Sequence, residues 1–556
     1  MTALHAGSPA SAAAGLDQPA FLRILDPEEV AALRPAADGP LAGTPFAVKD
    51  NIDVAGVPTS AACPARTTPA QRSATAVRRL LDAGAVPVGK TNMDQFATGL
   101  VGTRSPYGAC SSVFSAAHVS GGSSSGSAVA VAAGVVPLAL GTDTAGSGRV
   151  PAAFNGLVGM KPTRGLVPTR GVLPAAPSLD CVTTFTRTVS LARTALGVLA
   201  GHDPEDPWSR PAPAGLPVGV ARTMRVVAVP DGPLDLDPAH ARAWEAALAH
   251  AGTVARLVPV DVGAFLKAAQ LLYGGPFLAE RLAAFGDLLE PDGPHLDPTV
   301  RRIVLGARDI SGADVYAGQQ RLAELRAVAL GTFLGADALL LPVTPGHPTL
   351  AEVAADPVGA NARLGTYTNM VNLLDLCAVA VPAGLRADGL PFGVQLLAPA
   401  FADLPLLDLA ARWVGEPVGE PVEVPAHRGL LAVAGAHLTG EPLNQQLVAL
   451  GGRLHARART AGGYRMYRVP GPLPRPGLVR GAGGPVEGLE VEVWDLPAAG
   501  LGELLPTVAA PLALGPVELD DGSAVPGFLT DPGGVHATRD ITASGGWRAY
   551  RAAGGA

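Results

Sequence analysis

Two loops rich in glycine and serine carry the residues that are best suited to chemistry. The first loop is residues 121–128 (GGSSSGSA) and the second is residues 141–149 (GTDTAGSGR), and an apolar run separates them. Glycines let backbone N–H groups approach a ligand closely, and serine hydroxyls can attack a carbonyl or pass on a proton. Because the run between the loops is apolar enough to be buried, we expect a site on a rigid scaffold rather than a linker.

A serine nucleophile needs a base that takes its proton, and the sequence offers few. His118 is the one histidine near the first loop, and none lies near the second. Lys49 is the other candidate, because it follows the apolar residues 46–48 and burial would disfavour its charged form. An ordinary surface lysine at the end of a strand remains the alternative at this point.

Residues 122–126 also fit the G-x-S-x-G pattern of a nucleophile elbow, centred on Ser124. Such an elbow needs a hydrophobic strand directly before it, and residues 111–120 (SSVFSAAHVS) make a poor one. The loop is not a phosphate-binding loop either, because no Gly-Lys-Ser/Thr closes it. Ser124 is therefore a weak candidate for the nucleophile.

Lys49, the first loop and residues 141–165 (GTDTAGSGRVPAAFNGLVGMKPTRG) together resemble the amidase signature family over about residues 20–415. The resemblance implies an α/β fold, namely a layered domain with a mixed sheet. It implies that Ser147 is the nucleophile, that Ser123 is a bridging serine on a cis peptide, and that Lys49 is the base. No metal or organic cofactor is expected.

The same resemblance implies that the second loop stabilises negative charge. Backbone N–H groups of Thr144, Ala145 and Gly146, with Ser147 itself, match an oxyanion hole, in which one donor is worth roughly 3 kcal/mol. Asp143 and Arg149 would orient this loop through an ion pair. A solvated pair is the alternative for those two side chains.

Two further stretches, residues 90–105 (KTNMDQFATGLVGTRS) and 271–281 (LLYGGPFLAER), are similar to the allophanate hydrolase branch of the family. Tyr273 and Arg281 match the residues that recognise substrate in that branch. Allophanate is a small anionic amide, and arginine binds a carboxylate through two parallel hydrogen bonds. The two residues lie about two helical turns apart, with a break expected at 274–276. A core tyrosine and a surface arginine are the alternative.

Four segments near the carboxyl end resemble the C-terminal domain of allophanate hydrolases: residues 436–438 (AHL), 442–444 (PLN), 539–542 (RDIT) and 545–548 (GGWR). The resemblance implies a second reaction, in which N-carboxycarbamate, left after ammonia release, loses carbon dioxide. His437 is the candidate residue for it, and His455 and His536 are weaker ones. Alternatively, the domain only packs, assembles or recruits partners.

Helical and strand patterns alternate to about residue 400, which is typical of an α/β fold. We expect an amidase signature domain over 1–415, with its first 20 or so residues flexible. A linker over 416–430 would lead to a small α+β domain over 431–556. The expected helices are 73–83, 238–251, 260–285, 314–333 and 443–457, and the expected strands are 45–48, 85–89, 338–342, 463–468, 475–480 and 489–495.

Composition limits the function classes further. The 556 residues have a formal net charge of −7 and are 48% hydrophobic, which argues against nucleic-acid binding and against disorder. No run is long enough to span a membrane, no leader stands out, and the four cysteines are scattered, so we expect a cytoplasmic protein.

The expected partners are a small anionic amide substrate (allophanate), a second copy in a homodimer, and a urea carboxylase partner, since no biotin-carboxylase-like region is present. The alternative functions are a general amidase or an amidotransferase A-type subunit with a non-catalytic C-terminal module. A non-catalytic assembly protein that keeps the fold is a third, and the set of Lys49, Ser123 and Ser147 argues against it.

Overall fold

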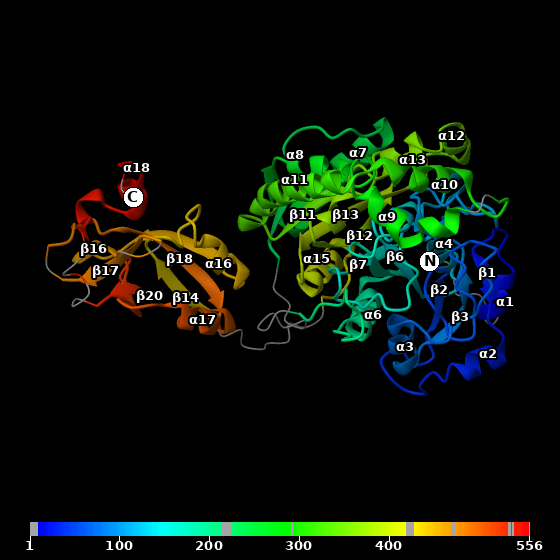
Figure 1. The fold of residues 1–556 in the computed structure, drawn as a ribbon, viewed down its shortest axis with the longest axis horizontal. Coiled ribbons are helices and arrows are strands. Elements are labelled where there is room, and N and C mark those ends of the chain that lie inside the picture. Colours follow the sequence, from blue (N-terminus) through cyan, green and yellow to red (C-terminus); the bar gives the residue numbers. More distant parts are fainter. Residues whose placement is uncertain are drawn as a thin grey trace. The chain divides into compact units, whose positions relative to one another are not determined.

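The chain forms two compact units in the computed structural model (Figure 1). The structure describes residues 9–212, 224–290, 293–418, 428–469, 471, 473–481, 483–531, 535 and 539–554. The first unit contains the described residues up to 418, and the second contains those from 428 onward. Most of the expected linker, residues 419–427, lies outside the described residues.

An 11-stranded mixed sheet runs through the first unit. Its strands, in spatial order, are β1 (Phe21–Ile24), β3 (Val86–Thr91), β2 (Pro45–Lys49), β6 (Leu138–Asp143), β8 (Cys181–Thr186), β7 (Val158–Lys161), β12 (Leu376–Leu385), β13 (Pro391–Pro399), β11 (Ala338–Pro342), β9 (Val226–Pro230) and β10 (Arg256–Val260). β2 is parallel to β3 and β6, and β9 is parallel to β10 and β11, whereas the other neighbours are antiparallel. The α/β class with a mixed sheet is confirmed.

Helices cover both faces of this sheet. They are α1 (Pro9–Ala14), α2 (Pro27–Ala32), α3 (Thr75–Asp82), α4 (Ser125–Ala132), α5 (Val150–Phe154), α6 (Val189–Leu199), α7 (Pro238–Val254), α8 (Gly263–Gln270), α9 (Leu278–Phe285), α10 (Pro298–Leu305), α11 (Gly312–Gly331), α12 (Leu350–Ala355), α13 (Gly359–Leu364), α14 (Met370–Leu373) and α15 (Asp403–Val414). The helical segment expected over 260–285 divides into α8 and α9 around the Gly274-Gly275-Pro276 segment, where a break was expected.

Alternating residues of β2 show why the sheet is buried on both sides. Phe46 and Val48 pack into one apolar cluster with α3, α6, α7 and α15, whereas Ala47 packs into another with α4 and α5. A strand with two buried faces has no polar alternation, which is the pattern of residues 45–48. The small side chains of α4 let it lie close to β2 and β6, so the first glycine-serine loop is held against the carboxyl end of both strands.

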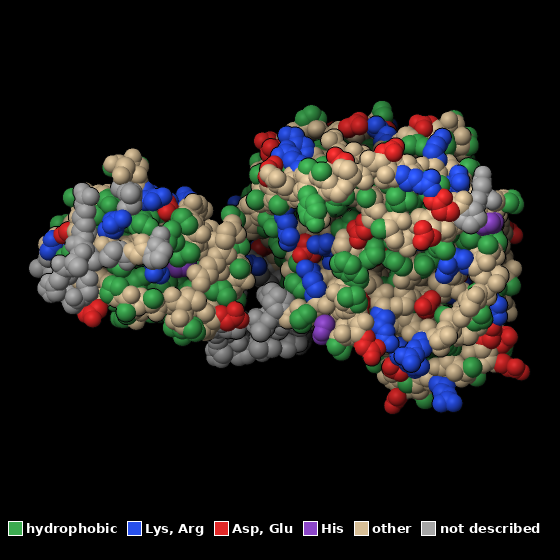
Figure 2. Space-filling view, in the orientation of Figure 1, with side chains coloured by type: hydrophobic (Ala, Val, Ile, Leu, Met, Phe, Trp, Pro, Cys, Tyr) green, Lys and Arg blue, Asp and Glu red, His purple; other side chains and the backbone are tan. Residues whose placement is uncertain are grey.

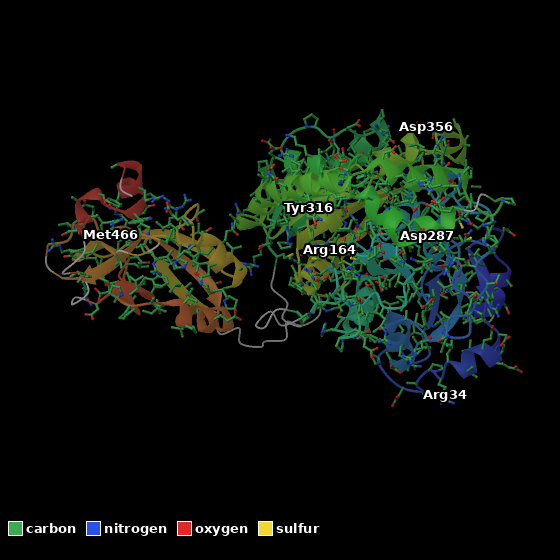
Figure 3. The ribbon with its side chains drawn as sticks, in the orientation of Figure 1. Arg34, Arg164, Asp287, Tyr316, Asp356 and Met466 are labelled. Atoms are coloured by element: carbon green, nitrogen blue, oxygen red, sulfur yellow. The ribbon has the colours of Figure 1, made fainter. Side chains whose placement is uncertain are left out.

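The second unit is rich in β-structure. Its strands are β14 (Arg428–Val433), β15 (Arg453–Arg459), β16 (Tyr464–Val469), β17 (Arg475–Arg480), β18 (Glu490–Pro497), β19 (Leu512–Glu518), β20 (Ala524–Thr530) and β21 (Arg539–Asp540), and its helices are α16 (Asn444–Ala449), α17 (Ala498–Leu504) and α18 (Trp547–Ala552). Met466, labelled in Figure 3, is fully buried in its core.

The expected helix over 443–457 is wrong beyond Ala449. Gly451 has a positive φ of 75°, which ends the helix, and the chain then continues as β15. β15 pairs with β18 in an antiparallel ladder, so sheet pairing rather than local helix propensity decides the conformation of residues 453–459.

On the face shown in Figure 2, acidic and basic side chains are interspersed rather than gathered into a patch of one sign. Some charges instead fasten segments together: Arg164, labelled in Figure 3, and Arg210 both pair with Asp375, just before β12. Within the described ranges, no helix is both long enough and apolar enough to cross a membrane.

Candidate active site

Lys49, the last residue of β2, is fully buried, so the surface-lysine alternative is wrong. Its Nζ lies 2.8 Å from Ser123 Oγ and 2.8 Å from Thr142 Oγ1. Burial lowers the pKa of Lys49 from 10.5 to about 7, although nearby carboxylates oppose this shift. A lysine with this pKa is largely neutral at slightly alkaline pH, so it can accept a proton from a serine.

The peptide bond between Gly122 and Ser123 is cis, as the family resemblance implies. Asp94 N–H donates to the carbonyl of Ser123 at 3.0 Å, which ties this loop to the end of β3. A Cβ added at position 122 would lie 2.0 Å from Asp94 Oδ2, so only glycine fits there. Asp94 belongs to a motif that the sequence singled out, but its contact with the loop was not anticipated.

Ser124 does not have the environment of an elbow nucleophile. Its hydroxyl donates to the carbonyl of Thr142 at 3.2 Å, and its side chain is fully buried. The strand that precedes the loop, β5 (Ser115–Val119), pairs with β4 (Ser111–Ser112) in a separate two-stranded sheet and not with the central one. His118, the other candidate base, contacts Ser115 Oγ through its Nδ1 at 2.9 Å.

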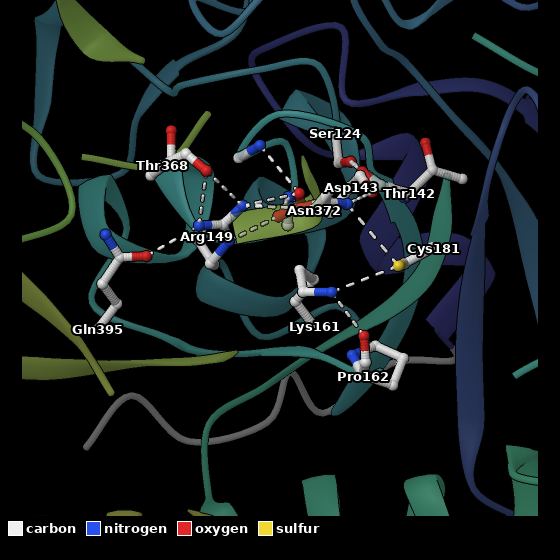
Figure 4. Close-up of polar contacts among 12 residues, drawn as sticks. Ser124, Thr142, Asp143, Arg149, Lys161, Pro162, Cys181, Thr368, Asn372 and Gln395 are labelled. Carbon is white, nitrogen blue, oxygen red and sulfur yellow. Dashed lines mark hydrogen bonds and ion pairs between the residues drawn. The ribbon is translucent and has the colours of Figure 1, made fainter. Parts of the chain in front are cut away.

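Ser147 lies in the loop between β6 and α5, and Asp143 organises this loop. Asp143 Oδ1 accepts the N–H of Gly146 at 2.9 Å, and Oδ2 accepts that of Gly148 at 3.0 Å. Arg149 donates to the same carboxylate from Nε and Nη2, each at 2.9 Å (Figure 4). Both side chains are fully buried, so the solvated-pair alternative is wrong.

Arg149 also ties the loop to β13 and to the segment that contains Thr368. Its Nη1 donates to Gln395 Oε1 at 2.9 Å, and both terminal nitrogens donate to the Thr368 carbonyl (Figure 4). Burial alone would raise the pKa of Asp143, but the Arg149 guanidinium, the Lys161 charge and the Gly148 N–H together hold that pKa below its ordinary value. Asn372, which sequence reasoning missed, donates to the Asp143 carbonyl at 2.8 Å.

The three amides expected in the oxyanion hole are not equivalent. The Gly146 N–H is directed to Asp143, so in this structure it is not available to a ligand. Within the described part of the chain, the N–H groups of Thr144, Ala145 and Ser147 have no hydrogen-bond partner. The carboxylate that shapes the loop would therefore compete with a ligand for the Gly146 amide.

The second link of the expected relay is not formed as a hydrogen bond. Among the contacts of the described residues, none joins Ser123 Oγ to Ser147 Oγ. Ser147 is 3% exposed, whereas Ser123 is completely buried. The structure thus places Lys49 on Ser123, and no side chain in the described ranges holds the Ser147 hydroxyl through a hydrogen bond.

Asp180 is a further buried carboxylate that no motif indicated. The Thr144 hydroxyl donates to its Oδ1 at 2.5 Å, and the N–H groups of Ala175 and Ala176 donate to its Oδ2. Burial raises the pKa of Asp180 to about 6. Asp180 therefore supports the second loop through its hydrogen bond with Thr144. It also lines a cavity of about 240 Å³.

Tyr273 and Arg281 lie together, but on separate elements. Arg281 belongs to α9, and Tyr273 lies in the turn after α8. Arg281 Nη2 donates to the Tyr273 hydroxyl at 2.9 Å, and the guanidinium carbon lies 5.2 Å from the ring centroid. Arg281 is only 2% exposed, so the surface-arginine alternative is wrong. Its charge affects the pKa values of Lys49 and Asp180, so all three lie within electrostatic reach of one another.

His437, in the second unit, lines a cavity of about 230 Å³. Burial lowers the pKa of His437 below 6.5, and its ring stacks on Phe528 with centroids 5.1 Å apart. His455 lies exposed on β15, and His536 lies outside the described residues. Throughout the described ranges, no group of three or more His, Cys, Asp or Glu side chains is arranged to hold a metal ion.

Comparisons with known families match most of the chain. The family described as Amidase matches residues 26–407, and the one described as Allophanate hydrolase C-terminal domain matches residues 429–552. A structure of a variant allophanate hydrolase from Kluyveromyces lactis is 38% identical, with a TM-score of 0.71, and the match covers 98% of this chain and 97% of that chain.

Two kinds of curated relative are also similar. The urea amidolyase of Lachancea kluyveri is 43% identical over 545 residues, which are 92% of this chain and 30% of that protein, so the chain spans about a third of this relative. The A-type subunit of the glutamyl-tRNA(Gln) amidotransferase from Deinococcus radiodurans is 38% identical over 405 residues, which are 67% of this chain and 83% of that protein.

Proposed function

Because this chain belongs to the amidase family and carries an allophanate hydrolase C-terminal domain, we propose that it hydrolyses allophanate to ammonia and carbon dioxide. Family membership makes it an amidohydrolase. The proposal for the substrate is supported by the likeness to the K. lactis allophanate hydrolase, which spans both units.

Arg281 is the observation that carries the choice of substrate. Its guanidinium is almost completely buried, yet across the described residues it pairs with no carboxylate and donates only to uncharged oxygens. A buried cation without a counter-ion is expensive, so a site of this kind fits an anionic ligand that supplies the missing charge. The carboxylate of allophanate would pair with Arg281, with the Tyr273 hydroxyl beside it, and the amide would then extend toward the Ser147 loop.

The first reaction begins at Lys49. Neutral Lys49 takes the proton of Ser123, and Ser123 takes the proton of Ser147, whose Oγ attacks the amide carbon. The Thr144 and Ala145 N–H groups would stabilise the oxyanion. The proton then returns to the leaving nitrogen, ammonia departs, and water hydrolyses the acyl-enzyme to N-carboxycarbamate. This transfer requires a hydrogen bond between Ser123 and Ser147, which would form when the substrate is bound.

The second reaction would take place at His437. N-carboxycarbamate loses carbon dioxide when its C–N bond breaks and the nitrogen gains a proton, which leaves carbamate. A histidine that is neutral in the empty site takes up a proton more readily beside a dianion, since opposite charge favours its charged form. His437 would then deliver that proton to the nitrogen.

A general amidase or an amidotransferase A-type subunit remains the second candidate, since one such subunit is similar over 67% of this chain. Ammonia release from allophanate, malonamate, acetamide and glutamine distinguishes the candidates. We expect the highest kcat/KM with allophanate. Efficient turnover of glutamine or acetamide without turnover of allophanate would overturn the proposal.

We further propose that a urea carboxylase supplies the substrate, because relatives named urea amidolyase are about three times as long as the matched region. Allophanate formed from urea and consumed in a coupled assay would support this partnership. A homodimer and a cytoplasmic location remain part of the proposal. All four cysteines are buried free thiols, which fits a reducing compartment, and light scattering of the purified chain would test the dimer.

A further inference from the structure

The cavity beside His437 has walls of two kinds. Its polar walls include His437, Gln446 and Arg475, and its apolar walls include Leu443, Val508, Leu512 and Phe528. Its volume of about 230 Å³ suits a molecule of only a few heavy atoms. A small, partly open cavity with few polar groups orients a ligand through those groups.

A chain of hydrogen bonds fixes which nitrogen of His437 carries its proton. The Thr507 hydroxyl donates to the Leu504 carbonyl at 2.7 Å, so it accepts from Gln446 Nε2 at 3.3 Å. Gln446 Oε1 must then accept from His437 Nε2, 3.0 Å away. The neutral ring therefore carries its proton on Nε2, and Nδ1 keeps its lone pair, with no partner among the described residues.

Arg475, at the start of β17, supplies the positive charge of this cavity. It is partly buried, and across the part of the chain that the structure describes it forms no ion pair with a carboxylate. Its charge helps, after burial, to lower the pKa of His437, so the guanidinium lies within electrostatic reach of the ring. An unpaired guanidinium in a cavity that also has apolar walls is well suited to a carboxylate ligand.

We propose that Arg475 binds one carboxylate of a small dicarboxylate in this cavity and places the ligand against His437 Nδ1. The inference deepens the proposed function, on which it rests, because the dicarboxylate would be N-carboxycarbamate. As its C–N bond breaks, the electron pair stays on nitrogen, carbon dioxide leaves, and protonated His437 gives its Nδ1 proton to that nitrogen. Carbamate and neutral His437 remain. Arg475 takes no proton and acts by binding.

Malonate is a suitable probe, since it replaces the central N–H of the intermediate by CH₂ and cannot react in this way. Calorimetric titration of the full chain should find two malonate sites, one at Arg281 and one at Arg475. Arg475→Met should remove one site, and Arg281→Met should remove the other. Arg480→Met is the matched control, because Arg480 lies on the same strand, is exposed and pairs with Glu518. It should keep both sites.

Two malonate sites of unchanged affinity in Arg475→Met, or a single site in the wild type, would overturn the inference. If melting shows that Arg475→Met does not fold, Arg475→Lys decides: we expect malonate to bind about tenfold more weakly, because lysine cannot form two parallel bonds. Affinity within twofold of the wild type would contradict the proposal. Failure of the proposed function would appear separately, as absent ammonia release from allophanate in the wild type.

Discussion

Lys49 Nζ lies 2.8 Å from Ser123 Oγ, and both side chains are completely buried. A charged amine could donate in this pair but could not take the serine proton. The burial that lowers the pKa of Lys49 to about 7 therefore sets the pH at which the pair can work as a base.

The first prediction is a pH profile. In the proposed relay Lys49 acts as the neutral amine, so kcat/KM for ammonia release should rise as the pH increases through about 7 and then level off. Lys49→Arg should be inactive over this range, because its guanidinium remains charged. Steady-state assays from about pH 5.5 to about pH 9 provide the measurement, because this range extends to both sides of the Lys49 pKa. A profile that is flat through pH 7 would contradict the role of Lys49.

The second prediction concerns Arg281. Arg281→Met should raise KM for allophanate by about 10- to 100-fold, since a hydrogen bond to a charged group contributes about 1.5–3 kcal/mol. Kinetics with a neutral amide such as acetamide are the control, because that substrate has no carboxylate to bind. Equal losses with both substrates would show that Arg281 holds the fold of the site rather than the substrate.

The third prediction concerns the buried pair of Asp143 and Arg149. Arg149→Met would leave a buried carboxylate without its counter-ion, which costs about 3–5 kcal/mol in the free energy of unfolding. The double variant with Asp143→Asn should recover part of that loss. Denaturant unfolding measures both, and Arg78→Met, in a largely exposed pair, is the control. Equal stability of wild type and Arg149→Met would be inconsistent with a pair that holds the loop.

The fourth prediction concerns Thr144, whose hydroxyl donates to Asp180 at 2.5 Å. Thr144→Val should lower kcat by about 10- to 100-fold, because an oxyanion donor that is out of place loses transition-state stabilisation. Thr144→Ser keeps the hydroxyl and should retain most activity. Because the pKa of Asp180 is about 6, the activity of the wild type should fall more steeply below pH 6. A kcat for Thr144→Val close to that for Thr144→Ser would refute this role.

Much of the fold could be predicted because its strands are short apolar runs with abrupt ends. β11 and β17 begin and end where the sequence patterns do. The helix expected over 443–457 failed because the pairing of β15 with β18 outweighs local propensity. Residues 260–285 broke into two helices at a glycine-proline segment that the sequence had marked, although the break was longer than expected.

The contact between Lys49 and Ser123 was predictable, because a motif carries each residue. Asp180 was not, because its importance comes from burial and from a contact with Thr144, 36 positions away in the sequence. The hydrogen bond of the Gly146 amide was not predictable for a similar reason. The sequence shows a glycine in the loop, but only the folded loop shows that Asp143 takes its N–H.

The most direct test of the account compares Ser147→Ala with Ser124→Ala, two serines in neighbouring loops. The measurement is kcat/KM for ammonia release from allophanate, after melting curves have shown that both variants fold. We predict that Ser147→Ala lowers it by about 10⁴-fold or more, because the nucleophile is lost, whereas Ser124→Ala stays within about tenfold of the wild type. Retained activity in Ser147→Ala, or its loss in Ser124→Ala alone, would contradict the assignment of Ser147 as the nucleophile.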